Sequence, residues 1–434
     1  MTARIRLATV YLASLASAFA APKPAMRDFM GLNGHTVQFK PELYTPVAGH
    51  VRDYHPVSWD LGNDTAILPP FPSAKNKVNW RSVYGSWKNA GWSTNACLTL
   101  NRLSAADWKN IESDSRSYAT AFARQFGPSS SNPLVSSVEI GNEPGTWSDE
   151  DYSRIFRSMA TGIREADPKL KIATCNINAR KSGKYHKTVD CVAFMPDLVD
   201  VLTIHSYPQL EGWPTWKRSF PEDPKLTKFL PDITDLCSWR DKHMPGKPVW
   251  ITEFGYDSTT KPNNKSGTFA KWQGVSDKQQ AQWLVRSFLI FSSLPVDRAY
   301  LYFFNDSDKP SVHASSGLTR DFKPKPSFHA VSHLYNTLGD YRFERIVKTD
   351  SAQLRAHDYR HSRNPKLRIR VCWTATGNDT PLTTEFNGVS GKLVSSSRMP
   401  LDEKPVPGGA TQPHPGTIHL TATGSPLYLM LEAE

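Results

Sequence analysis

Two glutamates stand in sequence contexts that suit paired acid–base and nucleophilic chemistry. Glu143 follows the run Val138–Ile140 and precedes Pro144, and Glu253 follows the apolar run Val249–Thr252. Two carboxyl groups at strand ends can flank a glycosidic bond: the protonated one donates to the leaving oxygen, and the ionised one attacks the anomeric carbon. We predict that Glu143 is the acid/base and Glu253 the nucleophile. A single strand-end glutamate is more often a surface carboxylate or half of an ion pair, so the prediction depends on the pair.

The elements that must position these glutamates are short β-like runs that alternate with helix-like segments. Several runs are continuously apolar, as in parallel strands buried on both faces. The runs are Phe29–Asn33, His50–Tyr54, Ala96–Asn101, Ser136–Asn142, Lys171–Asn176, Val199–Tyr207, Pro248–Phe254 and Arg298–Phe304. This alternation predicts a (β/α)8 barrel, in which the C-terminal strand ends share one face. A doubly wound open sheet is the alternative, disfavoured because no Gly-rich phosphate loop follows the first run.

The helix signals and a change of pattern near residue 340 divide the chain. Ser148 with Asp151 predicts a helix start, a second helix is predicted to begin at Ser276, and Pro168 ends the first of them. Beyond residue 340, short strand-like pieces are separated by Gly, Pro and Asn turns, which predicts a small antiparallel β-sandwich. We therefore expect a signal peptide over 1–21, a catalytic α/β barrel over 22–338 and an accessory β-sandwich over 339–434.

The N-terminus has the pattern of a secretory signal peptide. Arg4 and Arg6 precede the apolar run Leu7–Leu15, and Ala18-Phe19-Ala20 provides a small-residue cleavage site. We expect a secreted protein, extracellular or periplasmic, with no membrane span, because no later run reaches about 18 apolar residues. The formal net charge is +11, without a long basic run. Either a solvated basic surface or attraction to an acidic polymer would account for this charge.

Four motifs resemble those of clan A glycoside hydrolases, the retaining (β/α)8 glycosidases of the family 39/5 type. Asn142-Glu143-Pro144 looks like their acid/base signature, and Ile251–Gly255 looks like their nucleophile strand. Val51-Arg52 and Asp200–Pro208 are similar to their second and sixth strands. The resemblance spans residues 29–335, and the C-terminal sandwich resembles the accessory module of xylosidase- and iduronidase-like branches.

The resemblance implies roles for further side chains. Asn142 would hydrogen-bond the sugar 2-hydroxyl, Arg52 and Tyr207 would orient Glu253, and His205 would contact Glu143 or the sugar. The last strand lacks the family's usual platform Trp, so Phe303 or Phe304 is expected in its place. Positions at strand ends and in rim loops add candidate substrate contacts, namely Asn33, His35, His55, Trp59, Trp213 and Trp216.

Together these patterns predict a secreted retaining glycosidase that acts on an extracellular polysaccharide or oligosaccharide, endo-acting on a β-linked glucan. The alternatives are an exo-acting xylosidase- or uronidase-like enzyme, a transglycosylase and a non-catalytic glycan-binding barrel. No His, Asp or Cys cluster has metal-ligand spacing, so no metal or cofactor is predicted. No nucleic-acid partner is expected, and the protein is predicted to be a monomer. Cys175–Cys191 is the closest cysteine pair in sequence, should one disulfide form.

Overall fold

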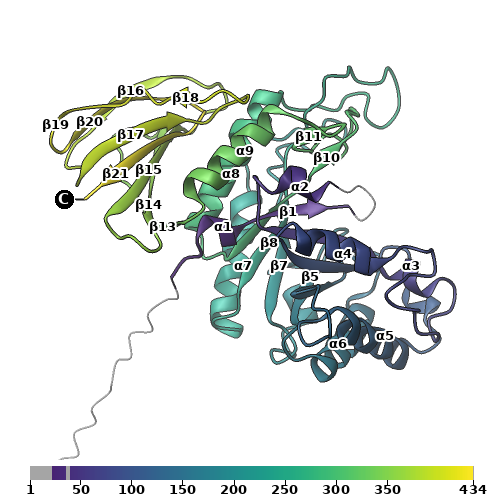
Figure 1. Cartoon of the computed structure of the whole chain (residues 1–434). Coiled ribbons are helices and arrows are strands. Elements are labelled where there is room, and N and C mark those ends of the chain that lie inside the picture. The colour runs from purple at the N-terminus through teal and green to yellow at the C-terminus, as the bar shows by residue number, and fades with distance from the viewer. Residues whose placement is uncertain (1–21, 36–39, 434) are drawn as a thin grey trace, which may run out of the picture.

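The computed structural model describes residues 22–35 and 40–433, so the predicted signal peptide lies outside the described residues. Its larger part is a closed barrel of eight parallel strands in the hydrogen-bonded order β4-β3-β2-β1-β9-β8-β7-β5, with β5 returning to β4 (Figure 1). These strands are β1 (Met30–Gly34), β2 (His50–Pro56), β3 (Ser93–Thr99), β4 (Ser137–Ile140), β5 (Lys171–Asn178), β7 (Val201–His205), β8 (Val249–Phe254) and β9 (Arg298–Leu301). The eight predicted strands and the barrel are confirmed, and the open sheet is excluded because the strand order closes.

Helices lie between the strands, on the outside of the barrel. The long ones are α4 (Trp80–Asn89), α5 (Ile111–Phe126), α6 (Asp149–Ala166), α7 (Phe229–His243), α8 (Asp277–Ser293) and α9 (Pro326–Leu338). The short elements are α1 (Met26–Phe29), α2 (Pro41–Tyr44), α3 (Val57–Leu61), η1 (Ala105–Asp107), η2 (Val189–Cys191), β6 (Lys187–Thr188), β10 (Asn305–Asp306), β11 (Thr319–Arg320) and β12 (Lys323–Pro324). The connection from β5 to β7 contains only β6 and η2, which leaves that side of the barrel mouth to loops.

Both predicted helix starts are confirmed by their capping bonds. Ser148 Oγ accepts from the Asp151 N–H at 3.0 Å at the start of α6. At α8, Ser276 Oγ accepts from the Gln279 N–H at 3.2 Å, and Gln279 Oε1 accepts from the Ser276 N–H at 3.0 Å. These bonds satisfy N–H groups that have no partner within the first turn of a helix.

The C-terminal part is the predicted antiparallel sandwich. One sheet has the order β13-β14-β15-β21-β17-β18 and the other β16-β20-β19. Their bounds are β13 (Tyr341–Ile346), β14 (Leu354–His361), β15 (Leu367–Thr374), β16 (Leu382–Phe386), β17 (Lys392–Arg398), β18 (Val406–Pro407), β19 (Thr411–His414), β20 (Thr417–Ala422) and β21 (Leu427–Glu432). The sandwich lies beside α8 and α9 (Figure 1).

A buried ion pair joins the sandwich to the barrel. Arg286 on α8 pairs with Glu222, and Glu222 also accepts from Trp373 Nε1 of β15 at 2.6 Å. Arg286 in turn donates to the Thr376 carbonyl at 3.0 Å. Because these groups are largely buried, each depends on the others for its hydrogen bonds.

Side chains fill the barrel interior toward the N-terminal ends of the strands, so the barrel is a packed core and not a pore. Ala173, Val201, Trp250 and Tyr300 form a buried cluster there. Gly31 makes room for it, because a Cβ at this position would lie 2.4 Å from the Tyr300 ring.

The five cysteines are buried free thiols, which rules out a Cys175–Cys191 disulfide in this structure. Within the described part of the chain, none of the helices combines the length and the apolar character needed to cross a membrane.

Candidate active site

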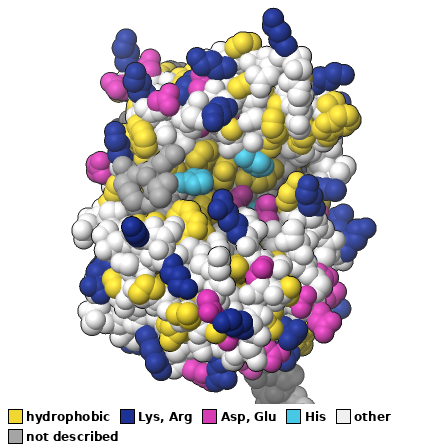
Figure 2. All heavy atoms as spheres, turned by 90° about the vertical axis from the view of Figure 1, so that its right-hand side faces the viewer, with side chains coloured by type: hydrophobic (Ala, Val, Ile, Leu, Met, Phe, Trp, Pro, Cys, Tyr) yellow, Lys and Arg dark blue, Asp and Glu magenta, His cyan; other side chains and the backbone are white. Residues whose placement is uncertain are grey.

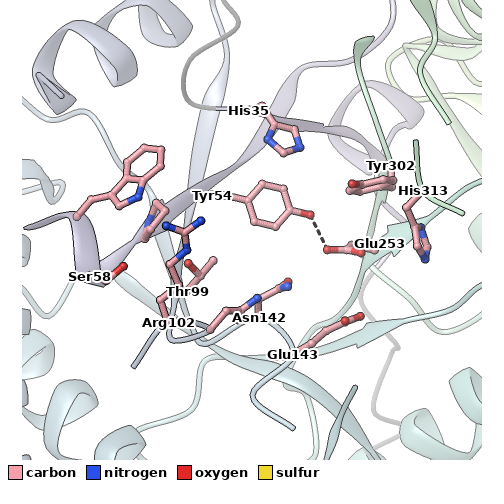
Figure 3. A pocket seen from close by; sticks show the side chains of 13 residues that line it. His35, Tyr54, Ser58, Thr99, Arg102, Asn142, Glu143, Glu253, Tyr302 and His313 are labelled. Atoms are coloured by element: carbon pink, nitrogen blue, oxygen red, sulfur yellow. Dashed lines mark hydrogen bonds between the residues drawn. The ribbon is translucent and has the colours of Figure 1, made fainter. Parts of the chain in front are cut away.

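Glu253 lies at the C-terminal end of β8 and is held by donors on both carboxylate oxygens. Its side chain is only 7% exposed. Oε1 accepts from Arg52 Nη1 at 2.9 Å and from Tyr54 Oη at 2.5 Å, the bond drawn in Figure 3. Oε2 accepts from Tyr207 Oη at 2.9 Å. Two donors from β2 and one from the segment just after β7 therefore fix the orientation of this carboxylate.

The same surroundings keep Glu253 ionised. Burial opposes its ionisation, but the nearby charges of His205 and Arg52 and the hydrogen bond from Tyr54 outweigh burial and lower the pKa to about 2. Burial raises the pKa of the Tyr54 and Tyr207 phenols well above the usual value, so both remain donors. An ionised, oriented carboxylate is what nucleophilic attack on an anomeric carbon requires.

Arg52 is the centre of a buried polar layer beneath Glu253. Its guanidinium is fully buried and makes a two-bond contact with Glu139, through Nε at 2.8 Å and Nη2 at 2.7 Å. It also donates to Asn33 Oδ1 at 2.9 Å. Glu139 thus fixes the plane of the guanidinium, leaving Nη1 directed at Glu253. This planar geometry is specific to arginine.

Glu143 reaches the same space because the chain turns sharply after β4. Gly141 has a φ of +87°, a left-handed conformation that glycine adopts without steric cost. The turn directs Asn142 and Glu143 toward the barrel axis. Asn142 Oδ1 accepts from Arg52 Nη2 at 2.7 Å, which leaves the amide N–H groups to face a ligand.

His205 connects the two glutamates. It pairs in register with Glu253 across β7 and β8, and its Nδ1 lies 2.8 Å from Glu143 Oε1 and 3.5 Å from Glu253 Oε2. Carboxylate oxygens of Glu143 and Glu253 lie within 4.8 Å of each other. Glu143 is more open than Glu253, with 26% of its side chain exposed.

Glu143, His205 and Glu253 are also a group that could ligate a metal ion. Both oxygens of Glu253 already accept from neighbouring donors, however. A cation at this point would compete with the positive charge of Arg52 for the same lone pairs. The donor set therefore fits a hydrogen-bonded acid, histidine and nucleophile better than a metal centre.

Three hollows lie in series across this face of the barrel. The first cavity, of about 400 Å³, contains Glu143 and Glu253 and is lined also by Tyr54, Trp59, Arg102, Tyr302 and His313. The second, of about 570 Å³, shares Glu143 and His313 with the first and adds Tyr185, His205, Tyr207, Trp216 and Phe269. The third, of about 420 Å³, shares Ser58, Trp59 and Arg102 with the first. Figure 2 shows a hollow on this face, with apolar and histidine side chains inside and basic side chains around it.

The structure places the remaining predicted contacts in two groups. Trp59 and His35 line the first cavity, and Trp216 lines the second. Asn33 is buried and donates to the Thr252 and Leu301 carbonyls, where the pairing of β8 with β9 is irregular. Its role is therefore to complete the barrel hydrogen bonding, and we assign it no substrate contact.

His55, Phe304 and Trp213 are also corrected. His55 points out of the barrel, where it is fully buried and bonds Asp60 at 2.5 Å and Tyr84 at 2.6 Å. Phe304 is buried behind the cavity, and Trp213 is 75% exposed and lines none of the three hollows. The residue that lines the first cavity beside Glu143 and Glu253 is Tyr302, just after β9, in place of the predicted Phe303 or Phe304.

Sequence reasoning missed Tyr54, Glu139, Arg102 and His313. The inward direction of Tyr54 could have been predicted, because side chains two residues apart in a strand share a face and Arg52 was already assigned to the interior. Glu139 precedes Glu143 by four residues and could have been recognised as the partner that a buried arginine requires. Arg102 and His313 lie in loops, where no periodicity indicates which way a side chain points.

Solved structures with similar folds include several glycoside hydrolases. A family 39 glycoside hydrolase from Bacteroides cellulosilyticus WH2 has a TM-score of 0.67 at 17% identity, covering 93% of this chain and 80% of that one. A GH51 arabinofuranosidase from Xanthomonas axonopodis pv. citri has a TM-score of 0.64 at 13% identity, covering 95% and 98%. A family 30 subfamily 8 xylanase from Clostridium acetobutylicum has a TM-score of 0.60 at 14% identity, covering 96% and 98%.

These likenesses extend over the barrel and the C-terminal sandwich and confirm, for the fold, the predicted resemblance to clan A glycosidases. No protein-family model matches the sequence, and a search of curated proteins found no match.

Proposed function

We propose that the protein is a retaining glycoside hydrolase that uses Glu253 as nucleophile and Glu143 as acid/base. The observation that carries this proposal is the approach of their carboxylate oxygens to within 4.8 Å. Retaining enzymes place the two groups about 5–5.5 Å apart, whereas inverting enzymes need about 6.5–9.5 Å to admit a water molecule. The fold and the ionised state of Glu253 support the same chemistry.

The reaction proceeds in two displacements. In the first, a Glu253 oxygen bonds the anomeric carbon while the bond to the leaving oxygen breaks and Glu143 donates its proton to that oxygen. In the second, Glu143 removes a proton from water, the water oxygen bonds the anomeric carbon, and the ester to Glu253 breaks. Arg52, Tyr54 and Tyr207 hold the nucleophile during both steps, and Asn142 is placed to donate to the 2-hydroxyl.

We further propose endo-action on a β-linked polysaccharide, with a glucan as the first substrate to assay. The support is the row of hollows: the first and second cavities meet at Glu143 and His313, so a chain could extend on both sides of the scissile bond. Aromatic side chains in the second cavity suit stacking on sugar rings. Export through residues 1–21 and action as a monomer complete the proposal, supported by the N-terminal pattern and by a site built from one chain.

The test is product analysis on purified polysaccharides. Proton NMR during the first minutes should show a product with the anomeric configuration of the substrate, and size analysis should show oligosaccharides of mixed length. Glu253→Gln should abolish turnover while the circular dichroism spectrum stays unchanged. A first product of inverted configuration, or near-normal activity of a folded Glu253→Gln protein, would refute the proposed role of Glu253 as nucleophile.

A further inference from the structure

The first cavity contains one cationic side chain that the catalytic machinery does not use. Arg102 follows β3 and lines this cavity together with Ser58, Trp59 and Thr99. Within residues 22–35 and 40–433, Arg102 has no ion pair, hydrogen bond or aromatic stacking partner. It differs in this respect from Arg52 and from Arg218, which pairs with Asp257 at 2.9 Å at the other end of the cleft.

The nearby carboxylate, Asp107, forms no ion pair with Arg102 within the described residues. Asp107 lines the third cavity with Arg102, but it accepts from the backbone N–H of Ser104 at 2.6 Å and from its hydroxyl at 2.7 Å. In the lining of the first cavity, the carboxylates are Glu143 and Glu253 themselves. Among the described residues, the guanidinium of Arg102 therefore lines both cavities without an ion-pair partner.

The position of Arg102 relative to the catalytic pair shows which part of a substrate it would meet. Figure 3 places Arg102, Ser58 and Thr99 on one side of the pocket and Glu253 on the opposite side, with Tyr54 and Asn142 between them. Arg102 also lines the third cavity, together with Trp59. A sugar at this point is a neighbour of the one that reacts. It would find an indole for its apolar face and a guanidinium at its edge.

We propose that Arg102 selects an anionic sugar, so that the substrate is a β-linked glycan bearing a carboxylate or sulfate group on a unit next to the one attacked. The inference rests on the proposed glycosidase function and narrows its substrate class. Guanidinium binds carboxylate and sulfate oxygens through two parallel hydrogen bonds, which an ammonium or an amide cannot reproduce. Without Arg4 and Arg6 of the predicted signal peptide, the net charge of +11 becomes +9, which favours the approach of such a polymer over the whole surface.

The experiment uses matched polymers. Uronate-bearing and sulfated β-linked polysaccharides are each assayed beside their own carboxyl-reduced or desulfated form, so that the backbone is constant and only the charge changes. The wild-type protein should cleave the anionic member of a pair with kcat/KM about 10- to 100-fold higher, the range expected for a charge-assisted contact. The uronate and sulfate pairs together show which anion is preferred.

Two variants assign the preference to Arg102. Arg102→Gln should bring the ratio of the two kcat/KM values to about one. Arg102→Lys should retain only part of the preference for the anionic polymer, because lysine keeps the charge but loses the paired hydrogen bonds. The matched control is Arg81→Gln on α4, an exposed arginine outside the cavity lining whose replacement lowers the net charge equally and should leave the ratio unchanged. An equal or higher rate of the wild-type protein on the neutral members, or an unchanged ratio in Arg102→Gln, would overturn the inference.

A binding measurement separates this inference from the proposed function. Calorimetry with Glu253→Gln protein should show tighter binding of the anionic polymer than of its neutral form, and Arg102→Gln in that background should remove the difference. If the anionic polymer binds in an Arg102-dependent way but the wild-type protein does not cleave it, the anionic site is supported and the proposed glycosidase activity is refuted. If the protein cleaves only neutral polymers, the proposed glycosidase activity is supported and the anionic site is refuted.

Discussion

Removal of the Tyr54 hydroxyl should move the acid limb of the pH–rate profile to higher pH. Tyr54 Oη donates to Glu253 Oε1 at 2.5 Å and is one of the causes that lower the pKa of Glu253 to about 2. A hydrogen bond to a charged group contributes about 1.5–3 kcal/mol, which at 1.36 kcal/mol per pH unit corresponds to about 1–2 units. In Tyr54→Phe, the pKa of Glu253 should therefore rise to about 3–4.

The consequence for catalysis follows from the sign of this shift. As the proposed nucleophile, Glu253 must be ionised to attack, so activity should fall as pH drops through its pKa, and a higher pKa makes the fall begin at a higher pH. At pH 3 about nine-tenths of the wild-type carboxylate would be ionised, against about a tenth to a half in the variant. The assay is the ratio of kcat/KM at pH 3 to that at pH 6, which cancels any pH-independent loss of rate.

The control for this prediction is another buried tyrosine. Tyr84→Phe removes a hydroxyl that bonds His55 and lies outside the contacts of Glu253, so its ratio should match that of the wild-type protein. Each variant must give a native circular dichroism spectrum at pH 3 before its rate is used. An unchanged ratio in folded Tyr54→Phe would refute the view that this hydroxyl sets the ionisation of the nucleophile.

Three further substitutions test the framework around the site. Arg52→Met leaves two buried carboxylates without their cation and should lower the free energy of unfolding in urea by about 3–5 kcal/mol; a loss near zero would contradict the buried network. Gly141→Ala forces a side chain into a left-handed conformation at φ +87°, and should cost about 1–2 kcal/mol and lower kcat through displacement of the acid/base; full activity would show that the turn is dispensable. Glu222→Ala leaves Arg286 buried without its partner where sandwich meets barrel, and should lower the unfolding free energy by about 3–5 kcal/mol, whereas an unchanged urea midpoint would indicate that this contact is not formed.

Much of the fold followed from local patterns. The eight apolar runs predicted the barrel because parallel strands covered on both faces leave few polar residues in sequence, and Ser148 and Ser276 predicted helix starts because their hydroxyls satisfy free N–H groups. The two glutamates were recognisable because each ends an apolar strand, and strand ends share one face of a barrel.

Side-chain direction was predictable in part. Arg52 and Tyr54 alternate with Asp53 and His55 along β2, so the assignment of Arg52 to the interior already implied that His55 faces the helices. The structure agrees: His55 is buried against Tyr84 and Asp60, outside the barrel. The substrate contact predicted for His55 was wrong because nearness to a strand end was weighed above this alternation.

The sequence by itself determined the strands, the helix starts and the two carboxyl groups that suit glycosidic chemistry, because these depend on neighbours along the chain. The alternation along β2 placed Tyr54 on the same face as Arg52, but only the tertiary structure decided that its hydroxyl reaches Glu253, that Glu139 pairs with Arg52, and that Tyr302 and Arg102 face the cleft. Those contacts join residues far apart in sequence. They depend on strand register, on the closure of the barrel and on loop conformation, and none of these leaves a periodic signal in the order of the amino acids.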